Sequence, residues 1–303
     1  MAGIKKNIVL AHLAVIGANI IYGINYVVAK GIMPDYFPPR VAIIFRVVGA
    51  TAIFWLVGIF FPKVHISKKD YLRLAVCGFF GIALNQIMFF EGLNLTTPIN
   101  ASIIMVGIPI LVLIFAHFIL KEGITKNKVF GILLGMGGAI YLILRGSGGS
   151  FTTGTFLGNF FILINASSYA LFLVLVKPLM VKYPPLVIMK WIFTFGLIYV
   201  LPVSAGLLGE PDYSHIPFTI WMSVAYIVIF TTVIAYFLNN YSLKNISPTV
   251  NSAYIYLQPF LATVVALTAG KDVLTWNEII AAGFIFTGVY FVSFRGMEYW
   301  KNG

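Results

Sequence analysis

Residues 98–125 read PINASIIMVGIPILVLIFAHFILKEGIT, and residues 248–275 read PTVNSAYIYLQPFLATVVALTAGKDVLT. The two stretches agree in the spacing of two prolines, a serine, a lysine and a threonine, and an acidic residue follows the lysine in each. A second set of identities recurs 147 positions along: Tyr22, Lys30, Met33, Tyr36 and Pro38 match Tyr169, Lys177, Met180, Tyr183 and Pro185. The sequence therefore predicts an internal duplication, with one copy in residues 1–146 and the other in residues 147–303.

The chain of 303 residues is strongly apolar. Hydrophobic residues make up 60% of it and charged residues only 10%, whereas a soluble domain carries about 25% charged residues. The aromatic content of 16% excludes a disordered chain. We therefore expect an integral membrane protein, in which the lone Cys77 is an apolar filler inside a helix. The net charge of +11 is interpreted as lysines and arginines of membrane loops, with no nucleic acid as a partner.

Ten stretches are apolar enough to cross a bilayer as helices, for which about 20 residues are needed. They are 8–29, 41–61, 72–90, 98–120, 129–144, 156–176, 187–208, 218–241, 248–269 and 277–294. The connections are short, so the predicted fold class is all-α and the chain is one membrane unit. Because each copy holds five spans, an odd number, the second copy is expected to be inverted in the membrane, as in many secondary transporters.

The positive residues predict the orientation of the chain. With the N-terminus in the cytoplasm, the cytoplasmic segments hold fifteen Lys and Arg residues and the outer segments hold four. Such a bias is typical of cytoplasmic loops. We expect a multi-pass protein of the bacterial plasma membrane with both termini in the cytoplasm.

Several short motifs occur in an order typical of one family. The first motif is Tyr22-Gly23-x-Asn25-x4-Lys30, and the second is Pro39 with Arg46. The third consists of Pro98, Ser102, Pro109, Lys121-Glu122 and Gly131. Most of this third motif recurs in the second half as Pro248, Ser252, Pro259 and Lys271-Asp272. They resemble the motifs of the drug/metabolite transporter superfamily, in its two-repeat EamA type. The resemblance implies ten helices and export of small metabolites such as amino acids without ATP. The chain departs from the family pattern at Tyr22, where Trp is usual, and at Phe193, which stands at the second-copy position of Arg46.

Arg46 lies inside the second span, where an ionised side chain costs about 2.5–3.5 kcal/mol or more and therefore needs a partner or a task. In one interpretation it binds a carboxylate of the solute. In the other it pairs with Glu91, at the same end of the third span, or with helix carbonyls. Glu91 itself is interpreted as a structural or gating group of the interface, with proton carriage as the alternative.

Further polar residues in the spans are candidates for contact with a solute. The full candidate set is Tyr22, Asn25, Arg46, Asn85, Gln86, Tyr169, Asn251, Tyr254 and Gln258. Asn251, Tyr254 and Gln258 are spaced three and four apart, so a continuous helix places them on one face. The alternative for each is packing or interhelical hydrogen bonding.

The prolines and glycines predict breaks and close approaches. Pro109 and Pro259 each remove a backbone donor and are expected to bend or break spans four and nine, either as gating kinks or as static bends. Gly131 and Gly135 form a G-x-x-x-G motif that allows close helix packing, either between two protomers or between two spans of one chain, and it leaves the oligomeric state open.

The sequence predicts no cofactor, no metal site and no enzymatic activity. It has no phosphate-binding loop, no pair of cysteines and no clustered carboxylates. We predict a secondary transporter that exports small organic solutes, such as amino acids or amphipathic metabolites, by alternating access between the two repeats, with the solute and the bilayer as its partners. The alternative is an integral membrane enzyme or lipid-handling protein, which needs a cluster of acids or histidines at one interface.

Overall fold

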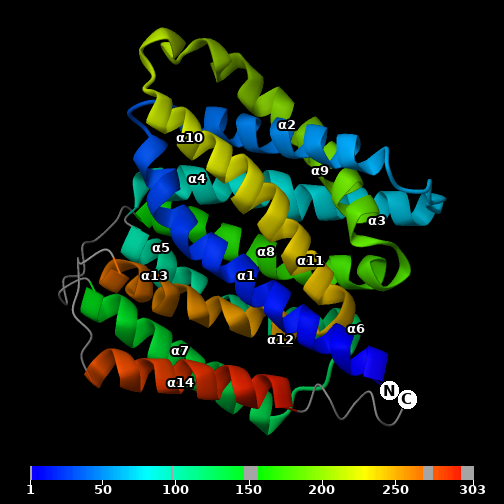
Figure 1. The fold of residues 1–303 in the computed structure, drawn as a ribbon, viewed down its shortest axis with the longest axis vertical. Helices are drawn as coiled ribbons and strands as arrows, with labels where there is room; N and C mark the ends of the chain where they lie inside the picture. The colour runs from blue at the N-terminus through cyan, green and yellow to red at the C-terminus, as the bar shows by residue number, and fades with distance from the viewer. Residues whose placement is uncertain (1, 97, 147–155, 269–275, 295–303) are drawn as a thin grey trace.

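The computed structural model describes residues 2–96, 98–146, 156–268 and 276–294, and these residues form helices and turns without a β-strand (Figure 1). The first half contains α1 (Ala2–Ile32), α2 (Pro39–Gly58), α3 (Lys68–Gly78), α4 (Asn85–Leu95), α5 (Pro98–Met105), α6 (Ile108–Leu120) and α7 (Lys126–Gly146). The second half contains α8 (Phe156–Lys182), α9 (Pro185–Ser204), α10 (Phe218–Tyr226), α11 (Ala235–Asn245), α12 (Pro248–Ala253), α13 (Leu257–Thr268) and α14 (Trp276–Phe294). The repeated Lys271-Asp272 pair lies outside the described residues.

Seven helical stretches of the described chain are long and apolar enough to cross a membrane. They are Asn7–Ile32, Pro39–Gly58, Lys68–Leu95, Ala101–Leu120, Phe156–Lys182, Pro185–Gly209 and Phe218–Asn245. A shorter apolar helix, Ile279–Ser293, corresponds to the last predicted span. The predicted span at 129–144 and the described residues 248–268 of the ninth span are helical as well, although the ninth span is divided. An all-helical membrane protein is therefore confirmed.

Irregular helix occurs at matching places in the two halves. Between α3 and α4 the chain forms a π-helical segment, η1 (Phe79–Leu84), and between α10 and α11 it forms another, η4 (Ile227–Ile234). Single turns of π-helix are rare and are found mostly at functional sites. Each segment leads into a helix that carries cavity residues, as described below.

The prolines that the sequence singled out stand at breaks. Span four divides between α5 and α6, and Pro109 occupies the first turn of α6. Span nine divides at a 3-10 turn, η5 (Tyr254–Tyr256), which precedes Pro259 in α13. The predicted interruptions at equivalent depth are thus present, and whether they act as gates stays a prediction.

Helices of one half pack against helices of the other. α1 packs on α11, and in the same way α4 packs on α8; α2 pairs with α9, and α7 with α14. In the α7–α14 pair a side-chain carbon at Gly131 would lie 2.6 Å from the backbone oxygen of Gly288, and one at Gly138 would lie 2.9 Å from that of Ala281. The glycine motif therefore joins two spans of the same chain.

The repeated lysines bind the carboxyl ends of helices. Lys30 Nζ donates to the backbone oxygen of Leu93, at 3.0 Å, in the last turn of α4. Lys177 Nζ donates to the backbone oxygens of Leu243 and Ile246 at the end of α11. A cation is favourable there because the carboxyl end of a helix carries partial negative charge and unpaired carbonyls.

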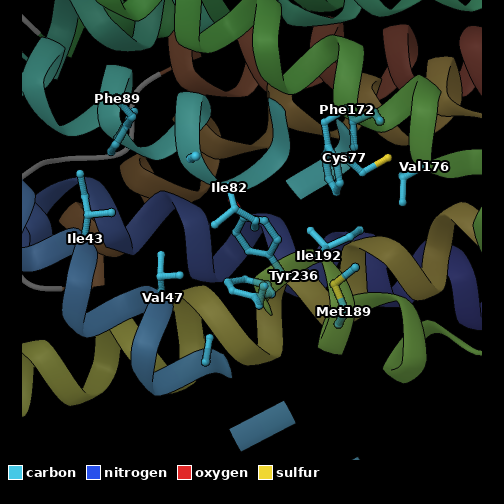
Figure 2. Packing of buried hydrophobic residues seen from close by; sticks show 14 of the residues in the cluster. Ile43, Val47, Cys77, Ile82, Phe89, Phe172, Val176, Met189, Ile192 and Tyr236 are labelled. Carbon is cyan, nitrogen blue, oxygen red and sulfur yellow. The ribbon is translucent and has the colours of Figure 1, made fainter. Parts of the chain in front are cut away.

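A buried apolar cluster fills the space between α2, α4, α8, α9 and α11 (Figure 2). Its fully buried members include Phe90, Phe172 and Phe193. Cys77 is buried in the same cluster, as expected of an apolar filler. Phe89 and Tyr236, which also belong to this cluster, line the cavity next to it.

Candidate solute-binding cavity

A cavity that opens to the outside lies among helices of both halves, with about 590 Å³ of space not filled by atoms, part of which is open solvent. Its wall contains seven of the nine predicted solute-binding residues: Tyr22, Asn25, Arg46, Asn85, Gln86, Tyr169 and Gln258. The other six residues of the wall are Phe89, Met105, Asn165, Thr231, Tyr236 and Ile255. The structure thus brings together side chains from seven different predicted spans.

Three pairs of repeat-equivalent positions line this cavity. Tyr22 and Tyr169, which are 147 residues apart, both line it. So do two pairs that are 150 residues apart, Gln86 with Tyr236 and Met105 with Ile255. The cavity therefore lies where the two copies meet.

Arg46 is the one charged residue in the wall of this cavity. Its side chain comes from α2 and is only 4% exposed. Nε donates to Thr232 Oγ1 at 2.9 Å, and Cζ lies 5.0 Å from the centre of the Phe90 ring. The hydroxyl and the ring hold the guanidinium on the wall and supply part of the favourable contact that a buried cation needs.

The expected ion pair between Arg46 and Glu91 is wrong. The Glu91 carboxylate instead accepts a hydrogen bond from Arg40 Nε at 2.7 Å, and Arg40 Nη1 also donates to the backbone oxygen of Val203 at 3.3 Å. In the described part of the chain no ion pair includes Arg46. Because a guanidinium has five N–H donors and only Nε is engaged here, the rest of the group is available to a solute.

Several amide groups of the wall are buried without a hydrogen bond of normal geometry. These groups are Asn25 Oδ1, both polar atoms of the Gln86 amide, and Asn165 Oδ1. Buried polar atoms are otherwise nearly always paired, so each of these has a reason to remain free. They supply acceptors, and in Gln86 also donors, that can bind water or the polar part of a solute.

Three tyrosines, Tyr22, Tyr169 and Tyr236, form the aromatic part of the wall together with Phe89. Tyr169 Oη accepts a hydrogen bond from Asn239 Nδ2 at 3.0 Å. Tyr236 Oη donates to the backbone oxygen of Gly81 at 3.3 Å and contacts Asn85 Oδ1 at 3.4 Å. The rings of Tyr22 and Tyr236 meet edge to face, with centroids 6.3 Å apart. These contacts hold the three rings in place and join two of them to neighbouring amide groups.

Asn251 and Tyr254 do not line the cavity, although Gln258 does. Asn251 Nδ2 contacts the backbone oxygen of Asn239 at 3.3 Å and Ser242 Oγ at 3.0 Å. Tyr254 Oη contacts His12 at 2.6 Å. The predicted common face assumed an unbroken helix, whereas η5 interrupts it between these residues.

Some wall residues escaped the sequence analysis although a signal was present. Asn165 lies four residues before Tyr169, so both are on one face of α8. Tyr236 stands at the second-copy position of Gln86. Met105 and Ile255 carried no such signal because apolar residues fill every span.

A cavity with several polar side chains in its wall, between two related halves of a helical membrane protein, is the type of site that small-solute carriers use. The chain belongs to the EamA-like transporter family, whose model matches residues 9–144 and again residues 156–294. It is thus a transporter of that family, with one match to each half.

Curated relatives and a solved structure agree with this assignment. The chain is 27% identical to "Uncharacterized transporter YyaM" of Bacillus subtilis (strain 168), over 92% of each protein. It is 21% identical to a "Probable terminal-alkyne amino-acid exporter" of Streptantibioticus cattleyicolor, over 75% of this chain and 74% of that protein. A solved structure entitled "Crystal structure of protein" has a TM-score of 0.76 at 18% identity and covers 95% of this chain and 98% of its own, which shows a shared fold.

Proposed function

We propose that the protein is a secondary exporter of small organic solutes that carry a carboxylate, with amino acids as the leading class. The observation that carries this proposal is the buried Arg46, which lines the cavity without an acidic partner in the described chain. A guanidinium binds a carboxylate through two parallel hydrogen bonds, and that geometry suits a carboxylate better than an amine or a neutral group.

The remaining wall residues fit the rest of an amino acid. The free oxygens of Asn25 and Asn165 can accept hydrogen bonds from an ammonium group. Phe89, Met105 and the tyrosines offer an apolar surface to a side chain. One relative is named an amino-acid exporter, which supports the same class of solute.

We also propose ten membrane spans in two inverted repeats, residues 1–146 and 147–303, which alternate in opening the cavity to either side. Contacts along the helices support opposite directions for the two copies. α8 lies antiparallel to α4, since Thr96 contacts Asn159 while Asn85 contacts Asn165. Lys30 joins the carboxyl end of α1 to the carboxyl end of α4, which indicates that α1 and α4 run in the same direction. Because α8 is antiparallel to α4, α1 and its second-copy counterpart α8 run in opposite directions.

A plasma-membrane location with cytoplasmic termini belongs to the same proposal. In Figure 1 the start of α1 and the end of α14 lie at the same end of the bundle, which supports placing both termini on one side of the membrane. The lysine and arginine bias supports the cytoplasm as that side. The names of the relatives favour transport over an enzymatic or lipid-handling role.

A phenylalanine series tests the solute class. Purified protein is heated with L-phenylalanine, L-phenylalanine amide, 3-phenylpropionate or phenethylamine, and a bound ligand raises the melting temperature. We expect stronger stabilisation by the two carboxylates than by the amide or the amine. Counterflow of labelled L-phenylalanine in proteoliposomes then measures transport. A protein that binds phenethylamine and ignores both carboxylates contradicts the proposed role of Arg46.

A further inference from the structure

A second polar contact joins α1 to span nine, away from the cavity. His12 Nδ1 lies 2.6 Å from Tyr254 Oη, and the two rings have centroids 5.7 Å apart. His12 is half-buried and Tyr254 is buried. Tyr254 begins η5, the irregular turn that divides span nine. The contact therefore sits at the one place where this span is not regular α-helix within its described residues.

The same segment continues into the cavity wall. Ile255, next to Tyr254, and Gln258, four residues after it, both line the cavity. Gln258 Nε2 donates to Asn19 Oδ1 at 2.8 Å. Because His12 and Asn19 lie seven residues apart, two helical turns, they share a face of α1. Two polar contacts thus hold α1 against span nine, one at the cavity and one nearer the start of α1.

Three acidic side chains in or beside the described helices are engaged in ion pairs. Asp70 pairs with Lys182, Glu91 with Arg40, and Glu122 with Lys128. His117, the other histidine in a described span, is exposed and bonds the backbone oxygen of Glu122. His12 differs from all of these because it is half-buried and contacts a neutral hydroxyl.

The elements packed on α1 are α10, η4, α11, η5 and α13. Their titratable or charged side chains are Tyr226, Tyr236, Tyr241, Lys244, Tyr254 and Tyr256. None of these is an acid, and Lys244 is exposed. A proton added to the His12 ring would therefore meet no compensating negative charge among the described side chains around it.

We propose that His12 is the binding site of the proton whose gradient drives transport, an inference that rests on the proposed transport function. Histidine changes charge near neutral pH, within the range that a cytoplasm spans. In the tautomer with its hydrogen on Nε2, neutral His12 accepts a hydrogen bond from the Tyr254 hydroxyl at Nδ1. The protonated ring carries N–H on both nitrogens, so Nδ1 can only donate to Tyr254 Oη, and the hydroxyl hydrogen must turn to another acceptor.

Protonation also places a positive charge in a half-buried contact without an acid beside it. A buried charge without a partner favours hydration, so the contact between α1 and η5 loosens. The bound proton thereby favours opening at the end of the bundle where α1 begins, which we predict to face the cytoplasm. Loss of the proton removes the charge, lets the hydroxyl donate to Nδ1 again and closes that end.

Two transport assays on the full-length protein in proteoliposomes test this inference. The first is counterflow of labelled L-phenylalanine at equal pH on both sides, and the second is its accumulation under an imposed pH gradient. We expect His12→Gln to lose the accumulation that the gradient adds. His117→Gln is the matched control, and it is expected to keep the wild-type accumulation. Melting curves establish that both variants fold.

Tyr254→Phe provides a second test, because it keeps the ring and removes only the hydroxyl. We expect it to move the pH at which gradient-driven accumulation is half-maximal, whereas a purely structural contact leaves that midpoint in place. A His12→Gln protein that still accumulates phenylalanine like the wild type overturns the inference. So does a wild-type protein that exchanges phenylalanine but ignores the gradient, and in both cases the proposed transport function survives. A wild-type protein that exchanges no member of the phenylalanine series overturns the transport proposal, and the proton site falls with it.

Discussion

Asn85 and Asn165 each donate a side-chain N–H to the backbone oxygen of the other, at 3.5 Å and 2.8 Å. Both residues are buried and both line the cavity. The pair therefore ties α4 to α8 at the cavity wall while leaving Asn165 Oδ1 free to face a solute. Asn165 thus stabilises the contact between two helices and also supplies a polar atom to the cavity wall.

Replacing Asn165 is expected to affect both properties. Asn165→Ala removes the interhelical hydrogen bond that Asn165 Nδ2 donates to the backbone oxygen of Asn85, worth about 0.6 kcal/mol on average, and also the free acceptor in the cavity. We expect a lower melting temperature and weaker stabilisation by L-phenylalanine. Asn159→Ala is the matched control, because Asn159 joins the same two helices through Thr96 and lies outside the cavity wall. It should lower the melting temperature alone, and equal loss of ligand binding in both variants would contradict a binding role for Asn165.

Arg46 is expected to set the preference for carboxylates. Arg46→Gln removes hydrogen bonds to a charged group, worth about 1.5–3 kcal/mol, so carboxylate binding should weaken roughly 10- to 100-fold. The affinity for phenylalanine amide should fall little in the same variant. Calorimetric titration of the wild type and the variant with both ligands measures the two changes in affinity. Thr232→Val is the control, since it removes the partner of Nε and keeps the charge. An Arg46→Gln protein that still prefers the acid to the amide would locate the carboxylate site elsewhere.

Two neighbouring glycines on α7 should respond in opposite ways to alanine. A side-chain carbon at Gly138 would lie 2.9 Å from the backbone oxygen of Ala281, so Gly138→Ala must push α7 and α14 apart and lower the melting temperature. At Gly137 nothing lies within 4 Å, and alanine there should stabilise the helix by about 0.5–1 kcal/mol. Thermal unfolding of the purified variants measures both changes. If Gly138→Ala unfolds no earlier than the wild type, α7 and α14 do not pack this closely.

The Arg40–Glu91 ion pair should contribute little to stability. The two side chains are 42% and 22% exposed, and pairs in contact with solvent are typically worth about 0–1 kcal/mol and weaken with salt. We expect Glu91→Gln to fold normally and to keep its response to a pH gradient in the proteoliposome assay. Loss of that response in Glu91→Gln, with His12→Gln unaffected, would make Glu91 the proton carrier instead.

The sequence predicted the helical fold and most of the cavity because polar residues are conspicuous in apolar spans. Asn25, Asn85, Gln86 and Arg46 each stood out for that reason, and all four line the cavity. The duplication added Tyr22 and Tyr169 as a matched pair. Phe89 and Met105 do not stand out in the same way, because apolar and aromatic residues face the lipid, fill the core and line cavities alike.

Other features depend on geometry that spacing does not contain. Arg40 and Arg46 both lie in the first half of α2. Which of them reaches Glu91 depends on the distance between α2 and α4 at the position of each arginine. Likewise, the positions of Asn251 and Tyr254 depend on the 3-10 turn, which changes the rotation per residue within span nine. The prediction from residue spacing assumed a regular α-helix through residues 251–258.

Arg46 has no counterpart in the second copy, where Phe193 stands at the equivalent position and is packed against Phe54 and Tyr236. The two copies are therefore not interchangeable, despite their common ancestry. A tandem chimaera made of two first copies would bring two guanidiniums to its centre, and one made of two second copies would bring none. Divergence after the duplication has thus left the group that we propose binds the anion in one copy alone, and a symmetric homodimer could not have this arrangement.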